Sequence, residues 1–450
     1  MDFNSFDNYI AGHQEKFIDD LKAFLRQPSI AATGEGVHEM ANLLQGRLES
    51  IGAKVQQFPT GRAPIVYAEL GSGPRTLMIY NHYDVQPADP IDLWTTPPFE
   101  PTLRDGKLFA RGVSDDKGDL VCRIQAIASW QKTIGALPLK IKWVIEGEEE
   151  VGSENLAEFA EKHKDILKAD GCLWEGGGKD EADRYVLSMG LKGIQYLELR
   201  VHGARRDLHS GYAAIVPSPV WRLIWALNTI KDEHDNILID GYYAHVRQPN
   251  EAELKMLRAM PFDETALKKM FGFDRFIENE TGLDLLKRFL YGPTATICGI
   301  HAGYTGEGMK TVLPNYAFAK MDFRLVPNLT PELCLSLLRA HLDRRGFTDV
   351  EIVPMSAEYP ALSPVDAQIV EAARSAAREI YGHDPIMQPL VAGSGPMHPL
   401  STALGIPAVL AGIGYADTRA HAPDENIRMS DYWEGMKFIG RLIDRFARTA

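Results

Sequence analysis

Cysteine is scarce in this chain, which excludes two kinds of stabilising or metal site. The 450 residues include only 4 cysteines, and no two of them form a CxxC pair. They are Cys122, Cys172, Cys298 and Cys334. Disulfide frameworks need denser cysteines, and thiolate zinc sites need closely spaced pairs. We therefore expect buried, free thiols in a protein of the reducing cytoplasm.

Long apolar runs and positive charge are also lacking. No apolar run approaches the ~20 residues that cross a bilayer. Residues 1–20 are acidic, without the basic and then apolar order of an export signal. Lys and Arg number 48 against 61 Asp and Glu, which gives a net charge of −13 at pH 7. Because phosphate contacts need a basic surface, we expect no nucleic-acid partner and no membrane partner.

The remaining composition is that of an ordinary globular protein. Hydrophobic residues make up 45% of the chain and charged residues 24%, both close to the average for folded proteins. A chain of 450 residues is too long for one ordinary hydrophobic core. We therefore predict two domains.

The first part of the chain alternates between strand-like and helix-like segments. An opening helix has its apolar face at Phe17, Ile18, Leu21, Phe24 and Leu25, and further helices are expected at 38–52, 119–133 and 155–164. Strands are expected at 54–58, 65–70, 76–80 and 139–145. This alternation predicts an α/β domain with a largely buried sheet.

The pattern changes near Lys192. Strands are expected at 193–201, 295–300, 316–325 and 349–353, with helices at 217–231 and 331–345. Without the charged helical stretch 251–290, the order is β-α-β-β-α-β, as in a ferredoxin-like layer. A loop at 354–364 leads back to an αβ segment and a final helix at 431–446. We predict that residues 193–356 are inserted into a larger domain formed by 1–192 and 357–450.

Two polar segments stand at element boundaries in the larger domain. His82 and Asp84 follow the strand 76–80 and share a face, because residues two apart in an extended chain point the same way. A carboxylate beside a metal-binding imidazole fixes its orientation. Asp115 and Asp116 precede a helix. Taken singly, these segments are also typical of a polar surface turn and a helix cap.

Three further segments carry carboxylates or imidazole. Glu148, Glu149 and Glu150 follow the strand 139–145. Adjacent carboxylates repel one another, so they need either a cation or full solvation as an acidic turn. Glu175 ends an apolar strand before three glycines, and His421 lies near the C-terminus.

Together these segments predict a metal centre. They place two histidines and several carboxylates at strand ends, where open α/β sheets bind their ligands. Such a set suits two divalent ions about 3.5–4 Å apart with one carboxylate bridging them. Nitrogen and oxygen ligands without thiolate indicate zinc, with manganese or cobalt as alternatives.

Six segments resemble a known family, the dinuclear zinc metallopeptidases that include carnosinase, cytosolic non-specific dipeptidase, aminoacylase, succinyl-diaminopimelate desuccinylase and bacterial glutamate carboxypeptidase. In family order they are NHYDVQP, RGVSDDKG, EGEEEVGS, DLHSG, DFRLVPN and RAHAPDEN, from about residue 80 to about residue 430. The resemblance implies a zinc-peptidase-like catalytic α/β domain with a mixed central sheet. It also implies an inserted ferredoxin-like α+β domain that serves as lid and dimerisation domain.

The resemblance also implies a role for each matched residue. His82 corresponds to a ligand of the first metal, and Asp84 to the residue that clamps its ring. Asp115 corresponds to the bridging carboxylate. Glu149 corresponds to the general base, and Glu150 to a ligand of the second metal.

The remaining two ligands correspond to Glu175 for the first metal and His421 for the second. Several dipeptidases of the family have Asp at the position of Glu175, whereas the aminoacylase and carboxypeptidase branches have Glu. The resemblance therefore leaves the dipeptidase and deacylase branches open.

In the inserted domain, His209 resembles the histidine that reaches the active site of a partner subunit and stabilises the oxyanion. Arg324 resembles the arginine that grips the substrate carboxylate, a task that suits a guanidinium fork. Gly393 and Ser394 resemble the loop on the other side of that carboxylate. A local cap for His209 and a surface ion pair for Arg324 are the structural alternatives. The family resemblance further implies a homodimer formed through the inserted domain, to which the apolar residues of 220–227 contribute.

The expected activity is metal-assisted hydrolysis of an amide bond in dipeptides or short peptides with a free C-terminal carboxylate. Two divalent ions per subunit activate a water, whose proton Glu149 takes and passes to the leaving amine. Removal of an N-acyl group from an amino acid is the competing activity. A catalytically silent, peptide-binding relative is the alternative of another class.

Overall fold

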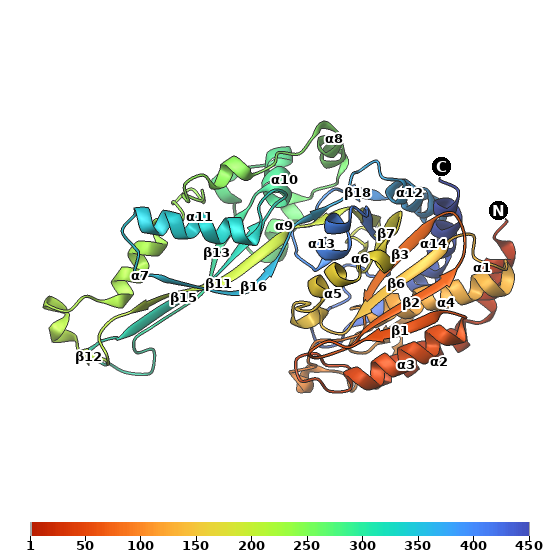
Figure 1. Cartoon of the computed structure of the whole chain (residues 1–450), viewed down its shortest axis with the longest axis horizontal. Helices are drawn as coiled ribbons and strands as arrows, with labels where there is room; N and C mark the ends of the chain where they lie inside the picture. Colours follow the sequence, from red (N-terminus) through yellow and green to blue (C-terminus); the bar gives the residue numbers. More distant parts are fainter. Residues whose placement is uncertain (1, 450) are drawn as a thin grey trace. The chain divides into compact units, whose positions relative to one another are not determined.

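The computed structural model describes residues 2–449, which form two compact units (Figure 1). The first unit comprises residues 2–190, 362–389 and 396–449, and the second comprises residues 191–361 and 390–395. Among the described helices, none has the length and apolar character needed to cross a membrane.

A mixed sheet organises the first unit. Its strands follow the order β1-β2-β6-β3-β7-β19-β9-β18, with β8 beside β9. A smaller sheet has the order β20-β5-β4. The strands are β1 (Lys54–Phe58), β2 (Ile65–Gly71), β3 (Thr76–His82), β4 (Thr102–Arg104), β5 (Lys107–Phe109), β6 (Lys140–Glu146), β7 (Gly171–Trp174), β8 (Gly178–Lys179), β9 (Tyr185–Ser188), β18 (Ile386–Gln388), β19 (Ala408–Leu410) and β20 (Asn426–Arg428).

The middle of the large sheet is parallel. Strand β3 pairs in parallel with β6 on one side and with β7 on the other, and β7 pairs in parallel with β19. These strands are buried along nearly their whole length, as expected when both faces of a parallel sheet are covered. Their carboxyl ends therefore meet at one edge of the sheet.

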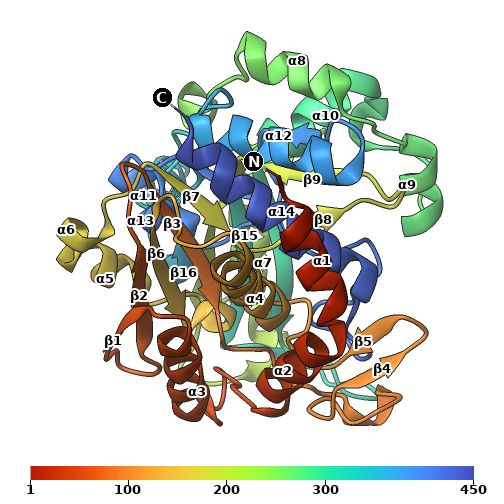
Figure 2. The same ribbon diagram turned by 90° about the vertical axis from the view of Figure 1, so that its right-hand side faces the viewer.

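Helices cover the sheet of the first unit. They are α1 (Asn4–Gly12), α2 (Gln14–Arg26), α3 (Val37–Ser50), α4 (Lys117–Thr133), α5 (Leu156–Lys162), α6 (Lys164–Leu167), α12 (Gln368–Tyr381), α13 (Met397–Leu400) and α14 (Met429–Ala447). Helix α4 packs against β3 and also against α1, α2 and α14 (Figure 2). A helix enclosed in this way is buried on nearly all sides, as α4 is.

The second unit has the predicted ferredoxin-like order. Its strands are β11 (Gly193–His202), β12 (Leu208–His209), β13 (Thr294–Ala302), β14 (Val312–Leu313), β15 (Tyr316–Leu325) and β16 (Glu351–Glu358), and its helices are α7 (Pro219–Leu227), α8 (Glu251–Ala259), α9 (Glu264–Phe271), α10 (Gly282–Tyr291) and α11 (Pro331–Arg344). The main sheet is antiparallel, in the order β13-β15-β11-β16. The alternation of apolar residues along β15 buries every second side chain. The predicted α/β fold with a mixed central sheet and a ferredoxin-like insertion is confirmed. The chain passes between the units through β10 (Gly190–Leu191) and β17 (Ala361–Leu362).

Two predictions for the second unit are wrong in detail. The loop expected to begin at Pro354 begins after Glu358, because β16 continues past the proline. Pro354 lacks an N–H donor but is tolerated because β16 is an edge strand and shifts register beside it. The expectation of buried thiols holds for three cysteines, but Cys298 is exposed. It lies on β13, the other edge strand of this sheet.

The short segment 390–395 also differs from the sequence analysis, which placed it in the larger domain. In the structure it belongs to the second unit. Leu390 is buried among Leu257, Leu286 and Leu290. The apolar contact of one leucine with two helices accounts for the assignment of this segment, which local sequence patterns do not reveal.

Candidate metal centre

The candidate metal centre lies at the carboxyl-terminal edge of the parallel strands. His82 is the last residue of β3, the acidic turn 147–150 follows β6, and Glu175 follows β7 directly. The register pairs His82 with Glu146 at the ends of β3 and β6. Because these strands are parallel neighbours, the topology alone brings the three segments together.

His82 is held rigidly by Asp84. The imidazole Nδ1 lies 3.1 Å from the backbone oxygen of Asp84 and 3.3 Å from its Oδ1. Both residues are buried. The Asp84 carboxylate also accepts hydrogen bonds from the backbone amides of Glu149 (3.3 Å) and Glu150 (2.9 Å). Asp84 therefore fixes the imidazole and the acidic turn relative to each other.

Asp115 joins the two histidines of the cluster. Its Oδ1 lies 2.9 Å from Nε2 of His82, and its Oδ2 lies 2.9 Å from Nε2 of His421. These contacts bring together residues from the loop before α4, the end of β3 and the loop between β19 and β20. A carboxylate that presents one oxygen to each imidazole has the arrangement of a bridging ligand.

The remaining carboxylates complete two donor groups. His82, Asp115 and Glu150 offer donor atoms within 4.8 Å of one another, and so do His82, Asp116 and Glu175. Nε2 of His82 lies 3.5 Å from Oε2 of Glu175. His421 adds a further donor, because its Nε2 lies 3.1 Å from Oε2 of Glu150. The structure thus brings together the seven predicted residues His82, Asp84, Asp115, Glu149, Glu150, Glu175 and His421.

The carboxylates give both histidines a high proton affinity. Burial disfavours a charged imidazole, but the negative charge of Glu175 and the hydrogen bond to Asp115 raise the pKa of His82 well above its usual value. Hydrogen bonds to Asp115 and Glu150 raise the pKa of His421 to about 10. Protons on these imidazoles neutralise the site in the way that bound cations would.

The carboxylates themselves are strongly perturbed. Burial raises the pKa of Glu149 and of Glu175 well above the usual value, and it raises the pKa of Asp116 to about 8. Asp115 is the exception. Its burial acts in the same direction, but hydrogen bonds from the two histidines lower its pKa. Several buried carboxylates so close together indicate a site built for positive charge.

Divalent cations fit this set of residues. Oε2 of Glu175 and Oδ1 of Asp116 are buried atoms without a hydrogen-bond partner among the described residues. Buried polar atoms normally have such partners, so these two oxygens point to a ligand. Imidazole nitrogen and carboxylate oxygen are donors that zinc, manganese and cobalt accept.

Asp116 was not singled out as a ligand from the sequence. One of its carboxylate oxygens accepts hydrogen bonds from Asn81 Nδ2 (2.6 Å) and from the backbone amide of His82 (3.2 Å). The other is the unpartnered oxygen described above. Nothing in the local sequence separates Asp115, which contacts both histidines, from the adjacent Asp116, which accepts hydrogen bonds from Asn81 and from the amide of His82.

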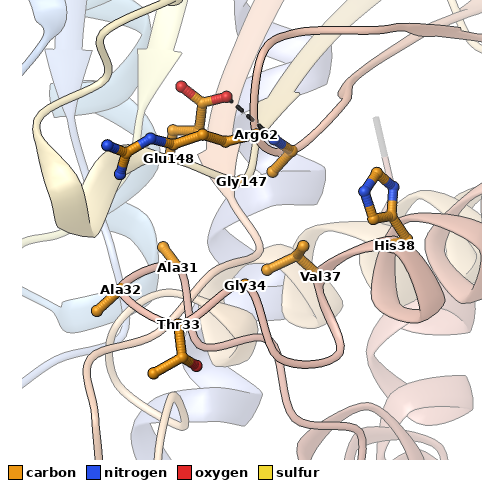
Figure 3. Close-up of a pocket in the computed structure, with 10 residues that line it drawn as sticks. Ala31, Ala32, Thr33, Gly34, Val37, His38, Arg62, Gly147 and Glu148 are labelled. Carbon is orange, nitrogen blue, oxygen red and sulfur yellow. Dashed lines mark hydrogen bonds between the residues drawn. The ribbon is translucent and has the colours of Figure 1, made fainter.

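The glutamates after β6 divide between structural and site roles. Glu146 accepts hydrogen bonds from the Tyr80 hydroxyl (2.6 Å) and the Ser153 hydroxyl (2.9 Å). Glu148 accepts from the backbone amide of Ala63 (3.1 Å), drawn as a dashed line in Figure 3, and from the Thr60 hydroxyl. These two residues anchor the turn, which leaves Glu149 and Glu150 for the site.

Figure 3 shows a pocket that is lined in part by Gly147 and Glu148 of the acidic turn. It has a volume of about 380 Å³. The residues that line it are Ala31, Ala32, Thr33, Gly34, Val37, His38, Arg62, Ala63, Gly147 and Glu148. None of these lining residues belongs to either donor group.

A buried arginine that sequence reasoning missed supports the strand ends. Arg123 of α4 donates hydrogen bonds to the backbone oxygens of Tyr80 (2.8 Å), Trp174 (2.7 Å) and Ala411 (3.1 Å). It also donates to Oδ1 of Asn81 (3.0 Å). One guanidinium therefore ties together the ends of β3, β7 and β19. A positive charge within the mostly apolar run 120–127 was the available signal.

The other predicted site residues belong to the second unit. His209 is the exposed last residue of β12, and its Nδ1 accepts a hydrogen bond from the amide of Gly211 (3.1 Å). Arg324, in β15, donates through Nη1 to the Ser394 hydroxyl (2.8 Å). The backbone oxygen of Gly393 accepts from the amide of Lys192 (2.9 Å). The predicted proximity of Arg324 to the segment 393–394 is thus present within this unit.

Comparisons with known proteins agree on one family. The model of peptidase family M20/M25/M40 matches residues 78–445. The Beta-Ala-His dipeptidase of Homo sapiens is 30% identical, with 98% of this chain and 92% of the relative covered. A solved M20 family metallo-carboxypeptidase of Sulfolobus solfataricus is 39% identical, with a TM-score of 0.91 over 96% of this chain and 99% of that one. The dipeptidase Dug1p of Saccharomyces cerevisiae is 25% identical, with a TM-score of 0.83 and 99% of each chain covered.

Proposed function

Since the chain belongs to peptidase family M20/M25/M40, we propose that it hydrolyses the amide bond of dipeptides or short peptides with a free C-terminal carboxylate. The observation that carries this proposal is the Asp115 carboxylate, which presents one oxygen to His82 and the other to His421. The dipeptidases and the carboxypeptidase among the similar proteins support the substrate class.

We assign the ligands as the family resemblance implies. His82, Glu175 and Asp115 would hold the first ion, and Asp115, Glu150 and His421 the second. The short distances among their donor atoms support this assignment. When bound, two divalent ions, zinc with manganese or cobalt as alternatives, polarise the amide carbonyl and lower the pKa of water towards ~7.

Glu149 is the proposed general base. Its carboxylate takes a proton from the attacking water and then delivers it to the nitrogen of the leaving amine. Burial raises the pKa of this carboxyl, which favours a group that holds a proton between the two steps. Its backbone amide is bonded to Asp84, so the same residue that orients His82 also orients the base.

Recognition of the substrate carboxylate is assigned to Arg324, with Gly393 and Ser394 beside it. The guanidinium carries five N–H donors in a planar fork, and one of them contacts the Ser394 hydroxyl. A carboxylate binds such a fork bidentately. His209 is proposed to stabilise the developing oxyanion in a partner subunit.

A homodimer through the second unit is part of this proposal. Helix α7 exposes Trp221 (58%), Ile224 (41%) and Trp225 (55%). Large aromatic residues clustered on one exposed helix are typical of protein interfaces. Light scattering should give twice the 50.1 kDa chain mass for the wild type. A W221E/W225E double variant should shift towards the monomer, and an unchanged dimer would contradict this choice of surface.

A matched substrate panel tests the activity. The metal-loaded protein is assayed with a dipeptide, the same dipeptide as its C-terminal amide, and an N-acetyl amino acid. Loss of a charge-assisted hydrogen bond costs about 1.5–3 kcal/mol, or about 10- to 150-fold. The dipeptide should therefore exceed its amide by at least about tenfold in kcat/KM.

The R324M variant is the control for the carboxylate. It should raise KM for the dipeptide and leave the slow turnover of the amide nearly unchanged. Faster hydrolysis of the N-acetyl amino acid than of any dipeptide would replace the proposal with a deacylase. Two bound metals without turnover of any member of the panel would indicate a silent relative.

A further inference from the structure

Glu425 is a fully buried carboxylate that lies close to His421 in the sequence. It belongs to neither donor group. Its relative exposure is 0%. Oε1 accepts hydrogen bonds from the backbone amides of Ser114 (2.8 Å) and Asp115 (3.1 Å). Oε2 accepts from the amide of Gly112 (2.9 Å) and from Nη1 of Arg111 (2.7 Å). One side chain thus binds three backbone amides of the loop that ends in Asp115.

The loop is tight enough to need this support. Gly112 has a φ of +81°, and a Cβ at this position would lie 2.5 Å from Cγ1 of buried Val85. The amides of Gly112, Ser114 and Asp115 share the Glu425 carboxylate as their acceptor. Without this acceptor, the backbone amides of Gly112, Ser114 and Asp115 would each lose a hydrogen bond.

The same segment also carries His421. The backbone oxygen of Glu425 accepts from the amide of Ala110 (3.1 Å), and Asn426 pairs with Phe109 between β20 and β5. The side-chain amide of Asn426 donates to the backbone oxygens of Asp417 (3.0 Å) and Asp424 (3.1 Å). The segment that holds His421 is therefore closed upon itself and attached to the loop that holds Asp115.

We propose that Glu425 is a positioning residue of the metal centre. It holds Asp115 at the short distance from His421 that suits a bridging carboxylate. This inference rests on the proposed two-metal function and deepens it. In this role Glu425 contacts neither the substrate nor a proposed metal-ligating atom, because its contact with Asp115 is to the backbone amide. It acts through three backbone amides and through the chain segment that it shares with His421.

The competing interpretation is that Arg111 and Glu425 form only a stabilising buried pair. The second unit offers a matched control. Glu253 is also buried, at 3% exposure, and binds Arg247 through two contacts of 2.6 and 2.9 Å. It also accepts from the backbone amide of Asn250 (2.7 Å). This pair resembles the first in chemistry, but no member of the donor groups is attached to it.

The test compares E425Q with E253Q by direct titration of the metal-free proteins with Co²⁺. Glutamine keeps the shape of the side chain but turns an NH₂ group towards backbone donors. Loss of a residue that orients a ligand typically costs about 10- to 100-fold in metal affinity. We expect that loss in E425Q, together with a changed visible spectrum of the bound Co²⁺. E253Q should bind two ions within about twofold of the wild-type affinity.

An E425Q protein that folds, binds two Co²⁺ ions with wild-type affinity and gives the wild-type spectrum would overturn the proposal. So would an equal loss of affinity in E253Q. If E425Q does not fold, R111K provides the second measurement, because it keeps a cation and the carboxylate but loses the directed Nη1 donor. It should weaken Co²⁺ binding several-fold, and wild-type binding by R111K would count against the proposal. A wild-type protein that fails to bind two ions would instead refute the proposed function.

Discussion

The adjacent residues Glu149 and Glu150 should have separable effects on catalysis and on metal binding. Oε2 of Glu150 lies 3.1 Å from Nε2 of His421 and accepts a hydrogen bond from Gln86 (2.9 Å). Glu150 belongs to a donor group with His82. Glu149 is in neither of the donor groups found among residues 2–449. Its backbone amide donates to Asp84, and its carboxyl is the proposed site of proton transfer.

The magnitudes follow from these positions. An E149Q variant keeps every proposed ligand and loses the proposed general base, a group that typically contributes about 10²- to 10⁴-fold to the rate. That loss corresponds to a barrier about 3–5 kcal/mol higher. An E150Q variant replaces a charged ligand with a neutral one, so we expect metal affinity to fall by at least about tenfold.

The assay has two readouts for each variant. Mass spectrometry after dialysis against limiting metal gives the number of ions bound, and steady-state kinetics on a dipeptide gives kcat and KM. E149Q should keep two ions and a KM near that of the wild type, with only kcat reduced. E150Q should lose one ion after dialysis against limiting metal, whereas its turnover should be kept when metal is in excess. The reasoning is refuted if E149Q keeps more than about a tenth of the wild-type kcat, or if it loses metal as readily as E150Q.

Three further outcomes follow from the same contacts. R123M should lower the free energy of unfolding in urea by at least about 3 kcal/mol, because four buried carbonyl acceptors lose the Arg123 guanidinium and each unsatisfied acceptor costs about 1–3 kcal/mol; a loss below about 1 kcal/mol would contradict this. The hydrogen bond to Asp115 leads the effects that raise the pKa of His421 to about 10 in the metal-free protein. Since this lies above the unfolded value of about 6.5, the stabilisation is complete below pH ~6.5 and is lost as the pH rises towards 10. Between pH ~6.5 and 10, the metal-free wild type should therefore lose more free energy of unfolding than H421N. Parallel plots of the two free energies against pH, measured by chemical unfolding, would contradict the raised pKa of His421. In G147A, the new Cβ would lie 2.3 Å from Cζ of buried Tyr83, so the acidic turn must move; we expect metal content and kcat to fall, and wild-type values of both would exclude such coupling.

Much of the site followed from local sequence patterns. His82, Glu150 and Glu175 each follow an apolar run, and parallel strands end at a shared sheet edge. The strands expected at 193–201 and 316–325 are likewise present as β11 and β15 in the sheet of the second unit. These features depend on the period of side chains along a few residues, which is written directly in the chain.

Supporting contacts were beyond such patterns. Glu425 and Arg123 are charged residues, which usually lie at the surface, so the sequence alone does not predict their burial. The separation of structural Glu148 from Glu149 depends on which glutamate meets the loop between β1 and β2. The extension of β16 past Pro354 depended on that strand lying at an edge.

The sequence by itself determined the family, the two folds and the residue types of the metal centre, because hydrophobic period and motif order are local properties. Only the tertiary structure decided how those residues are held. His421 contacts Asp115, and Glu425 binds the loop that ends in Asp115. Some three hundred residues of chain separate the partners in each contact. The partners of a buried charge are set by the packing of whole elements, since desolvation makes a polar group bond to whichever donors the fold delivers.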